Sequence, residues 1–213
     1  AEIQLPYGFK VTSINNVYLN ESRSTGTTNP YFGQYAASNG MVNKEHDRSW
    51  SYNYQQRINW HQVYGKHDVE VMLGHEYYRA YGYALYAGKH NQFSVDNKEL
   101  AGAVVLDNGS SSMSEYNTES WLSRAMYNYD SRYFGSVSAM RQASSRFSKD
   151  NWWGTFWSFG AGWNMHKESW FNVNWIDELK LKASYGENGN DGIGSYMYTK
   201  YFNIVNSNND VSL

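Results

Sequence analysis

Apolar and polar side chains alternate with a period of two over residues 50–60. The even positions are Trp50, Tyr52, Tyr54, Gln56, Ile58 and Trp60, and all the odd positions are polar. Such alternation is typical of a β-strand with one apolar and one polar face. The segment is longer than an ordinary strand of roughly five or six residues. It matches the ~9–11 residues with which a tilted strand crosses a bilayer, so it predicts a membrane-spanning strand.

Six further segments follow the same pattern less regularly, and the sequence therefore predicts about seven strands. The other six are expected within residues 9–19, 69–77, 121–129, 133–139, 157–163 and 179–185. Two long stretches, 20–48 and 86–118, show no clear period and are interpreted as irregular connections. Short turns are predicted at 64–67 and 130–132, and one helical turn within 166–171.

The predicted connections alternate between long and short. If consecutive strands are antiparallel, every long loop falls on one side of the sheet and every short turn on the other, as in outer-membrane barrels. A sheet in hydrocarbon must close, because each unpaired backbone group costs several kcal/mol there. Seven strands do not close a bacterial barrel, which has an even number of at least about eight. The predicted fold is therefore an all-β, antiparallel transmembrane β-barrel, of which this chain forms one part.

The alternation also predicts which side chains face lipid. A slip of the 50–60 strand by one residue would expose Arg57 to lipid at ~2–4 kcal/mol, so the register is strongly specified. The expected lipid-facing residues are Trp50, Tyr52, Tyr54, Ile58, Trp60, Val69, Val71, Leu73, Trp157, Phe159, Trp163, Leu179, Leu181 and Tyr185.

The composition supports a barrel and excludes several other classes. Aromatic residues reach 18%, whereas hydrophobic residues as a whole make up only 41%. No apolar run approaches the ~18 residues of a transmembrane helix, which excludes a helical membrane protein. The absence of cysteine removes disulfide scaffolds, thiolate zinc sites and cysteine nucleophiles. A formal charge of −2 provides no basic stripe, and a nucleic-acid partner is not expected.

No catalytic or metal site stands out from the residue pattern. His75-Glu76 begins like a zinc-binding H-E-x-x-H motif but ends in Arg79 and lies in a predicted strand rather than a helix. The carboxylates near strand ends are isolated from one another, so turn and cap roles explain them better than acid–base catalysis. The segments 107–109 and 206–210 offer oxygen ligands for Ca²⁺ in extracellular loops, although ordinary polar loop tips explain them more simply.

Aromatic residues in the predicted loops are the remaining candidates for function. They could stack on sugar rings or contact a second protein that covers the barrel. The candidates for substrate or partner contact are Tyr31, Phe32, Tyr35, Tyr86 and Trp152.

Residues 119–198 contain an ordered series of motifs. Ser123–Tyr129 is similar to G-R-x-x-Y-x-Y, and Ser136–Phe147 to S-x-R-x-D-G-S-S-R-F. Trp153–Trp163 is similar to W-G-x-F-P-S-x-S-x-G-W, and Lys167–Phe171 to an E-x-F connection. Leu179–Asn190 is similar to L-K-x-R-x-S-Y-G-x-x-G-N. In this order and spacing the segments resemble the C-terminal barrel of SusC/RagA-like TonB-dependent transporters of the Bacteroidetes outer membrane.

The chain departs from those motifs at Met140, Gln142-Ala143 and Trp157, and residues 1–118 share only the layout of strands and loops. The resemblance implies a twenty-two-stranded barrel with an N-terminal plug. It also implies import of glycans or peptides together with a SusD-like surface lipoprotein, energised by TonB–ExbB–ExbD. The plug and the TonB box are not in this chain, so the energy-coupling residues are expected elsewhere.

Two other functional classes fit part of the pattern. A passive porin, or another outer-membrane barrel, explains the strands and loops but not the series of motifs. A soluble, aromatic-rich carbohydrate-binding β-protein would have to bury the alternating faces in a compact core. An enzyme is not expected.

Overall fold

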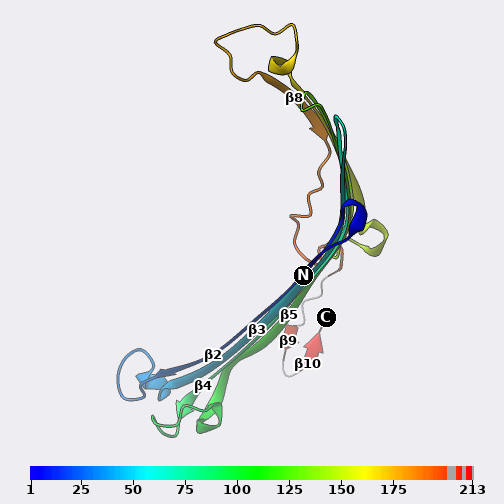
Figure 1. Cartoon of the computed structure of the whole chain (residues 1–213). Coiled ribbons are helices and arrows are strands. Elements are labelled where there is room, and N and C mark those ends of the chain that lie inside the picture. The colour runs from blue at the N-terminus through cyan, green and yellow to red at the C-terminus, as the bar shows by residue number, and fades with distance from the viewer. Residues whose placement is uncertain (201–204, 208–209, 213) are drawn as a thin grey trace. The chain divides into compact units, whose positions relative to one another are not determined.

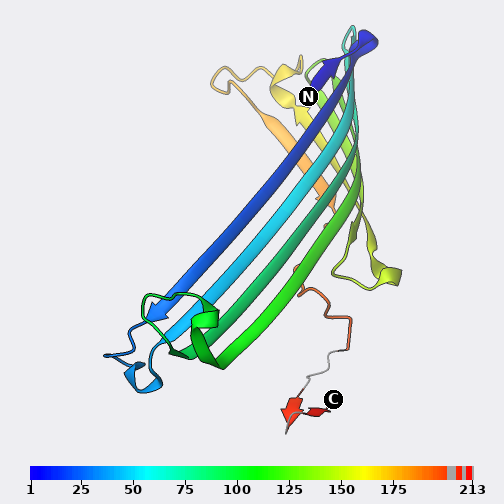
Figure 2. The same ribbon diagram turned by 90° about the horizontal axis from the view of Figure 1, so that it is seen from below.

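The computed structural model describes residues 1–200, 205–207 and 210–212. Eight strands form one sheet in chain order, and consecutive strands are neighbours (Figures 1 and 2). The strands are β1 (Glu2–Gln4), β2 (Phe9–Thr28), β3 (Met41–Tyr64), β4 (His67–Gln92), β5 (Ala103–Tyr129), β6 (Tyr133–Ser144), β7 (Trp153–Asn164) and β8 (Lys180–Gly186). A separate antiparallel pair contains β9 (Val205–Ser207) and β10 (Asp210–Ser212). The all-β fold class predicted from the sequence is confirmed.

Every helical segment within the described ranges is a single 3-10 turn. They are η1 (Pro6–Gly8), η2 (Ala36–Ser38), η3 (Leu100–Gly102), η4 (Lys149–Asn151) and η5 (Met165–Lys167). The last of these confirms the helical turn expected within 166–171. Among the described residues, no helix has the length and apolar character needed to span a membrane.

The chain divides into two compact units. Unit 1 comprises Ala1–Ile14, Tyr54–Tyr77 and Asn117–Leu213, and unit 2 comprises Asn15–Asn53 and Tyr78–Tyr116. Strands β2 to β5 contribute one part to each unit, whereas β6 to β8 belong to unit 1 alone.

The strand register in unit 1 brings the separately predicted apolar positions to one side of the sheet. Residues directly opposite in an antiparallel pair share a face. Tyr133 lies opposite Trp163, and Val137 lies opposite Phe159. Phe159 in turn lies opposite Tyr185. We call this side the apolar face; on β5 to β8 its larger members are Trp121, Tyr127, Tyr129, Tyr133, Val137, Trp153, Trp157, Phe159, Trp163, Leu181 and Tyr185.

Two polar residues that interrupt the predicted apolar face form a hydrogen bond with each other. Gln56 is the one polar residue at the even positions of 50–60, and Ser13 interrupts the pattern of the 9–19 segment. In the structure, Nε2 of Gln56 donates a hydrogen bond of 2.8 Å to Oγ of Ser13. Nearby, the rings of Phe9 and Trp60 lie 6.4 Å apart. Both strands therefore present these positions to the same side, and the two polar groups satisfy each other.

The apolar face does not cover a compact core. Trp157 is 40% exposed, Phe159 51% and Leu181 53%. Among the described residues, the buried hydrophobic side chains are Val42 and Ala103. A soluble carbohydrate-binding module would bury these aromatic residues, so the open sheet contradicts that alternative.

Two predicted connections were wrong. Residues 20–48 contain the end of β2 and the start of β3, so the irregular part is only 29–40. Residues 86–118 contain the end of β4 and the start of β5, which leaves 93–102 as the connection. Both faces of these strand ends carry polar residues, and alternation therefore gives no signal there. The prediction of about seven strands also missed β1, which has only three residues.

The two short hairpin turns form where the sequence predicts them. Asp130 and Ser131 have φ angles of 51° and 53°. Two central residues with positive φ are typical of the type I′ turn, whose twist matches that of the flanking strands. Gly65 has a φ of 61° in the other turn, where the lack of a Cβ atom avoids strain.

In unit 2, the side-chain amide of Asn39 ties the 29–40 connection to the end of β4. Nδ2 of Asn39 donates hydrogen bonds of 3.0 Å both to Oδ1 of Asn91 and to the carbonyl oxygen of Gln92. Gly40 lies beside Gln92 with a φ of 74°, and a Cβ there would come within 2.9 Å of the carbonyl oxygen of Thr28. The 29–40 connection is thus anchored to the end of β4 by local hydrogen bonds.

Candidate functional site

The first functional feature is the apolar face of unit 1, which has an aromatic residue near each end. On β7, Trp163 and Trp153 occupy the same face and are separated by ten residues. At ~3.3 Å per residue this is roughly 33 Å along the strand. A strand tilt of about 40° reduces this to ~25 Å, the height of the apolar band of an outer-membrane barrel. The spacing therefore fits a lipid bilayer.

A row of rings marks the turn end of this band. The Tyr129 and Tyr133 rings lie 6.3 Å apart, and those of Tyr133 and Trp163 lie 6.4 Å apart. Trp170 continues the row at 6.0 Å from Trp163. Amphipathic rings concentrate at membrane interfaces, and this row is typical of an aromatic girdle.

The opposite side of unit 1, which we call the polar face, contains a groove of about 590 Å³ between β4 and β8. Cross-strand rows make up its floor: Met126, Ser136, Gly160 and Ser184 form one row, and Asn128, Phe134, Gly162 and Lys182 form the next. Asp68, Glu70, Arg124, Lys180 and Lys182 supply its charged groups. Such a surface requires water or a polar ligand.

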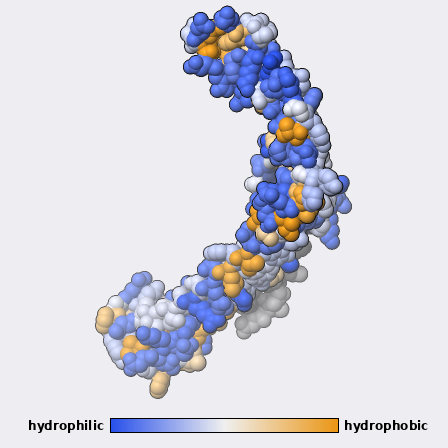
Figure 3. All heavy atoms as spheres, viewed as in Figure 1, coloured by the Kyte–Doolittle hydropathy of each residue, from blue (hydrophilic) through white to orange (hydrophobic). Residues whose placement is uncertain are grey.

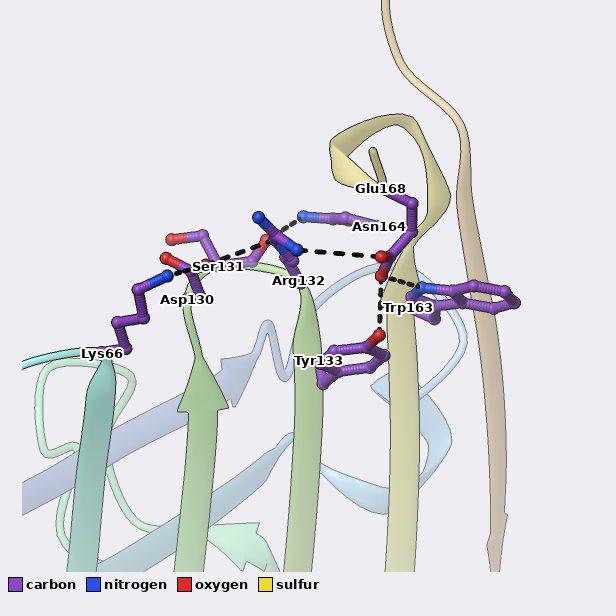
Figure 4. A network of polar contacts seen from close by, with 8 residues as sticks. All are labelled: Lys66, Asp130, Ser131, Arg132, Tyr133, Trp163, Asn164 and Glu168. Atoms are coloured by element: carbon purple, nitrogen blue, oxygen red, sulfur yellow. Dashed lines mark hydrogen bonds and ion pairs between the residues drawn. The ribbon is translucent and has the colours of Figure 1, made fainter. Parts of the chain in front are cut away.

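A network of polar contacts connects the turns of unit 1 (Figure 4). Glu168 accepts hydrogen bonds from the Tyr133 hydroxyl at 2.7 Å and from Nε1 of Trp163 at 3.0 Å. Arg132 lies 3.8 Å from the Glu168 carboxylate and 3.3 Å from that of Asp130. Lys66, in the β3–β4 turn, donates to Asp130 at 2.9 Å. The β3–β4, β5–β6 and β7–β8 connections are thereby joined through their side chains.

The network stabilises the ionised form of its two carboxyl groups. Hydrogen bonds from Trp163 and Tyr133 lower the pKa of Glu168, and the nearby Arg132 lowers it further. The hydrogen bond from Lys66 lowers the pKa of Asp130. Both carboxylates are consequently charged at neutral pH, which keeps the ion pairs with Arg132 intact.

Unit 2 carries charged side chains along its strands. Glu21 pairs with Arg23 at 2.6 Å and lies 3.1 Å from Nε2 of His46. The guanidinium of Arg79 lies over the Trp50 ring, 5.6 Å from its centroid, and Arg79 also pairs with Glu115. Figure 3 shows the loop end of this unit as mostly hydrophilic, with separate hydrophobic residues. Apart from Trp50 and Tyr52, which were predicted to face lipid and also belong to this unit, these strand parts are suited to water rather than to lipid.

The predicted contact aromatics are distributed unevenly. In the 29–40 connection, Tyr31 and Phe32 are 77% and 71% exposed. Tyr35, directly before η2 in the same connection, is 38% exposed. Trp152 donates from Nε1 to the carbonyl oxygen of Phe147 at 2.8 Å, so it stabilises its own loop.

Tyr86 does not lie in a loop: it belongs to β4 and lines a groove with Glu45, Asp47 and three serines, Ser110–Ser112. The prediction was wrong because β4 continues past the end of its recognisable alternation. Sequence reasoning also missed Phe93, which is 92% exposed in the 93–102 connection. An aromatic residue beside a turn-forming Ser-Val-Asp-Asn segment could have identified it.

The described residues show no metal-binding arrangement at the zinc-like His75-Glu76 pair or at the segments considered for Ca²⁺. The His75 ring lies tilted against that of Trp121 with 4.3 Å between their centroids, and Nε2 of His75 lies 3.1 Å from the Glu119 carboxylate, as expected of a histidine near the edge of the apolar face. Within the part of the chain that the structure describes, no three His, Asp or Glu side chains gather as a metal-binding group. The 107–109 segment lies within β5 rather than at a loop tip. Of the 206–210 segment, residues 208 and 209 lie outside the described residues.

Leu179, predicted to face lipid from a strand, precedes β8, and its backbone N–H donates to Nδ1 of His166. The strand begins one residue later because this contact holds Leu179 in the connection.

The chain is similar in sequence to TonB-dependent receptors. The chain is 31% identical to the TonB-dependent receptor SusC of Bacteroides thetaiotaomicron over 204 residues, which is 92% of this chain and 19% of SusC. It is 32% identical to a TonB-dependent receptor of Formosa agariphila over 151 residues, covering 70% of this chain and 15% of that receptor. No protein-family model matches the chain. The chain thus spans less than a fifth of the length of these curated relatives.

Solved structures have the same fold. The RagAB peptide transporter superimposes with a TM-score of 0.90 and 24% identity, over 99% of this chain and 24% of that one. The "open-open" state of the RagAB peptide importer gives a TM-score of 0.88. The relatives are receptors and transporters rather than enzymes.

Proposed function

The chain is homologous to part of the TonB-dependent receptors that include SusC, which are outer-membrane proteins, and from this premise we propose that it forms part of the barrel wall of a nutrient importer. The cargo is a glycan or a peptide oligomer. A SusD-like surface lipoprotein works with the barrel, and TonB–ExbB–ExbD supplies the energy through a plug domain elsewhere in the protein.

The observation that carries this proposal is the similarity to SusC over nearly the whole chain. An open sheet with one apolar and one polar face would suit a passive porin equally well. The porin alternative does not account for a match to energised receptors, and importer function is therefore the better conclusion.

The faces of the sheet have separate roles in this proposal. The apolar face of unit 1 contacts lipid, including Trp157, Phe159 and Leu181, and the polar face borders the transport path. The strands β2 to β5 have 20 to 27 residues, about twice the ~9–11 needed to cross a bilayer. The charged parts in unit 2 extend into water on the loop side.

The exposed aromatic residues of the unit 2 loops form the contact with cargo or the partner lipoprotein. Tyr31, Phe32 and Phe93 offer large rings to solvent, and aromatic residues are enriched among the anchors of protein interfaces. Tyr35 and Tyr86 contribute less exposed rings to the same unit. Trp152 supports the 145–152 loop of unit 1 from within.

Uptake by whole cells tests the proposal. The full-length protein is expressed in its native envelope with its neighbouring lipoprotein, and labelled maltooligosaccharides and mixed peptides of matched length are supplied. Deletion of TonB, or collapse of the proton gradient, should abolish accumulation of the cargo. A porin would continue to equilibrate cargo under both treatments, and that result would contradict the proposal.

A triple variant, Tyr31→Ala/Phe32→Ala/Phe93→Ala, tests the role of the loop rings. We expect it to reduce co-purification of the lipoprotein or cargo binding severalfold. The matched control is Tyr18→Ala, which removes an exposed ring from β2 in the same unit. Equal effects of the two variants would show that the loop rings have no special role.

A further inference from the structure

We infer that the groove on the polar face of unit 1 binds anionic groups, the carboxylates or sulfates of a charged cargo. The inference rests on the proposed importer function and narrows its substrate class. It assigns a ligand to Arg124, Lys180 and Lys182, which the proposed function leaves without a role.

Among the residues that the structure describes, no carboxylate pairs with any of the three cations. Arg124 comes from β5, and Lys180 and Lys182 come from β8. Within the described part of the chain, none of them has a carboxylate within 4.0 Å. The ammonium of Lys180 instead lies 4.0 Å from the centroid of the Phe134 ring, a contact that leaves its charge in place.

The two carboxylates that line the groove lie on β4, next to the strand of Arg124 but four strands away from that of the two lysines. Asp68 and Glu70 both come from β4, and Asp68 already contacts Nε2 of His61 at 2.8 Å. Strands β4 and β8 are four positions apart in the sheet, which is roughly 19 Å along a flat sheet at ~4.8 Å per strand. That separation exceeds the Debye length of ~8–10 Å at physiological salt. Lysines 180 and 182 therefore retain an uncompensated positive field.

The floor of the groove allows close approach. Gly160 and Gly162 place no side chain on the polar face, and their cross-strand neighbours include Ser136 and Ser184. A Cβ at Gly160 would lie 2.9 Å from Oγ of Ser136. The small residues leave the hydroxyl groups and the backbone open to a ligand between the cations.

The location of the charges points to a ligand rather than to a structural role. Charged side chains in membrane-spanning segments are costly unless they face a watery interior, and there they mark pathways for substrates. Charges that stabilise a fold are usually paired, as Lys66, Arg132 and their carboxylates are in the turn network of the same unit. A mobile anion supplies the missing counter-charge for the groove.

The test compares cargo of different charge in the full-length transporter with its partner. The variants are Arg124→Gln, Lys180→Gln/Lys182→Gln, and all three together. The control, Lys149→Gln, removes one cation from η4 outside the groove. The probes are an oligogalacturonate, an oligoglutamate-containing peptide, a neutral maltooligosaccharide and a neutral peptide, all of similar length.

We expect each lost charge to weaken binding of an anionic probe roughly three- to tenfold at low salt, with little change for neutral probes. Rising salt should reduce the difference between wild type and variant, because screening weakens the same interaction. A loss confined to the oligogalacturonate would identify an acidic glycan as cargo, and a loss confined to the acidic peptide would identify a peptide.

Two results would overturn the inference while leaving importer function intact. One is a wild-type transporter that accumulates neutral probes by a TonB-dependent route but does not bind the anionic ones. The other is an equal loss of neutral and anionic uptake in the triple variant, because this would show that the groove holds another part of the transporter. Uptake of every probe that persists without TonB would instead contradict the proposed function itself.

Discussion

Units 1 and 2 share strands β2 to β5 but use them differently. In unit 1 the part of β3 from Tyr54 onward alternates between apolar and polar residues, and its neighbours add to one continuous apolar face. In unit 2 the earlier part of the same strand carries Lys44, His46 and Arg48 at the positions that would continue that face. Hydrogen bonding between strands therefore does not require apolar and polar residues to alternate. A strand needs this alternation when one face contacts lipid, but not when both faces contact water.

The largest expected effect comes from a charge placed on each face. Val137→Arg puts a guanidinium on the apolar face of β6, at a cost of ~2–4 kcal/mol near the bilayer centre. Ser136→Arg, one residue earlier, directs the same group to the polar face and should cost much less. Val104→Arg on β5 of unit 2 should change stability by about 0.5 kcal/mol or less. Urea unfolding in lipid vesicles measures all three; equal losses would refute the distinction between units.

The turn network of unit 1 predicts a pH-dependent effect. Because the folded pKa of Glu168 is lowered, its carboxylate stabilises the fold above the ordinary carboxyl pKa of about 4.3, and this is lost as the pH falls through the lowered value. Glu168→Gln should therefore lower the Tm of the folded barrel at pH 7 but not in strong acid, where the wild type is also protonated. Thermal unfolding monitored by gel mobility measures this.

The control for that experiment is Glu178→Gln in the same connection, an exposed glutamate outside the network. Its Tm should follow that of the wild type at both pH values. A Tm difference between Glu168→Gln and wild type that is the same at pH 7 and in acid would show that the carboxylate charge is not responsible.

A substitution in the type I′ turn of unit 1 should give a smaller change, a gain in stability. Ser131 holds a positive φ at a cost that glycine avoids, so Ser131→Gly should stabilise the barrel by roughly 0.5–1 kcal/mol. The carbonyl oxygen of residue 131 would still accept the hydrogen bond from Nδ2 of Asn164. Ser136→Gly, in the extended backbone of β6, is the matched control and should be destabilising. A loss of stability on Ser131→Gly would contradict the turn assignment.

The smallest effect is expected in unit 2. The Arg79–Glu115 pair has side chains that are 37% and 31% exposed, and solvent screens such pairs. A double-mutant cycle with Arg79→Ala and Glu115→Ala should yield a coupling of about 0.5 kcal/mol that decreases with salt. A coupling of several kcal/mol would place this pair in a dry environment and would make unit 2 resemble unit 1.

The comparison of units also explains what the sequence can predict. In unit 1, the alternation identified β6, β7 and the apolar face, because Val137, Phe159 and Trp163 are required on one side by lipid. In unit 2, the sequence predicts a loop at Asp107–Ser112, although this segment belongs to β5. The strands of this unit pair through backbone hydrogen bonds, and side chains that contact water on both faces need no recognisable pattern. The same lack of signal misplaced Tyr86.

Sites formed between strands were the least predictable. Glu168 had a motif but no assigned partners, because its contacts with Tyr133 and Arg132 depend on how the β5–β6 and β7–β8 connections are aligned. The groove cations Arg124 and Lys182 belong to segments 58 residues apart, from 124 to 182, and no local pattern joins them. The motif resemblance supplied the family, whereas only the register showed which side chains meet.

Site-directed spin labelling tests the central claim most directly, because this part of the protein has no cysteine of its own beside the introduced one. Labels are placed singly along β7 from residue 153 to 163 and along β5 from 104 to 114, in the full-length protein in bilayers. We predict that on β7 the odd positions are accessible to oxygen dissolved in lipid and the even positions to a water-soluble nickel chelate. On β5 of unit 2, both sets of positions should favour the chelate. Loss of the two-residue period on β7, or lipid accessibility along 104–114, would contradict the account.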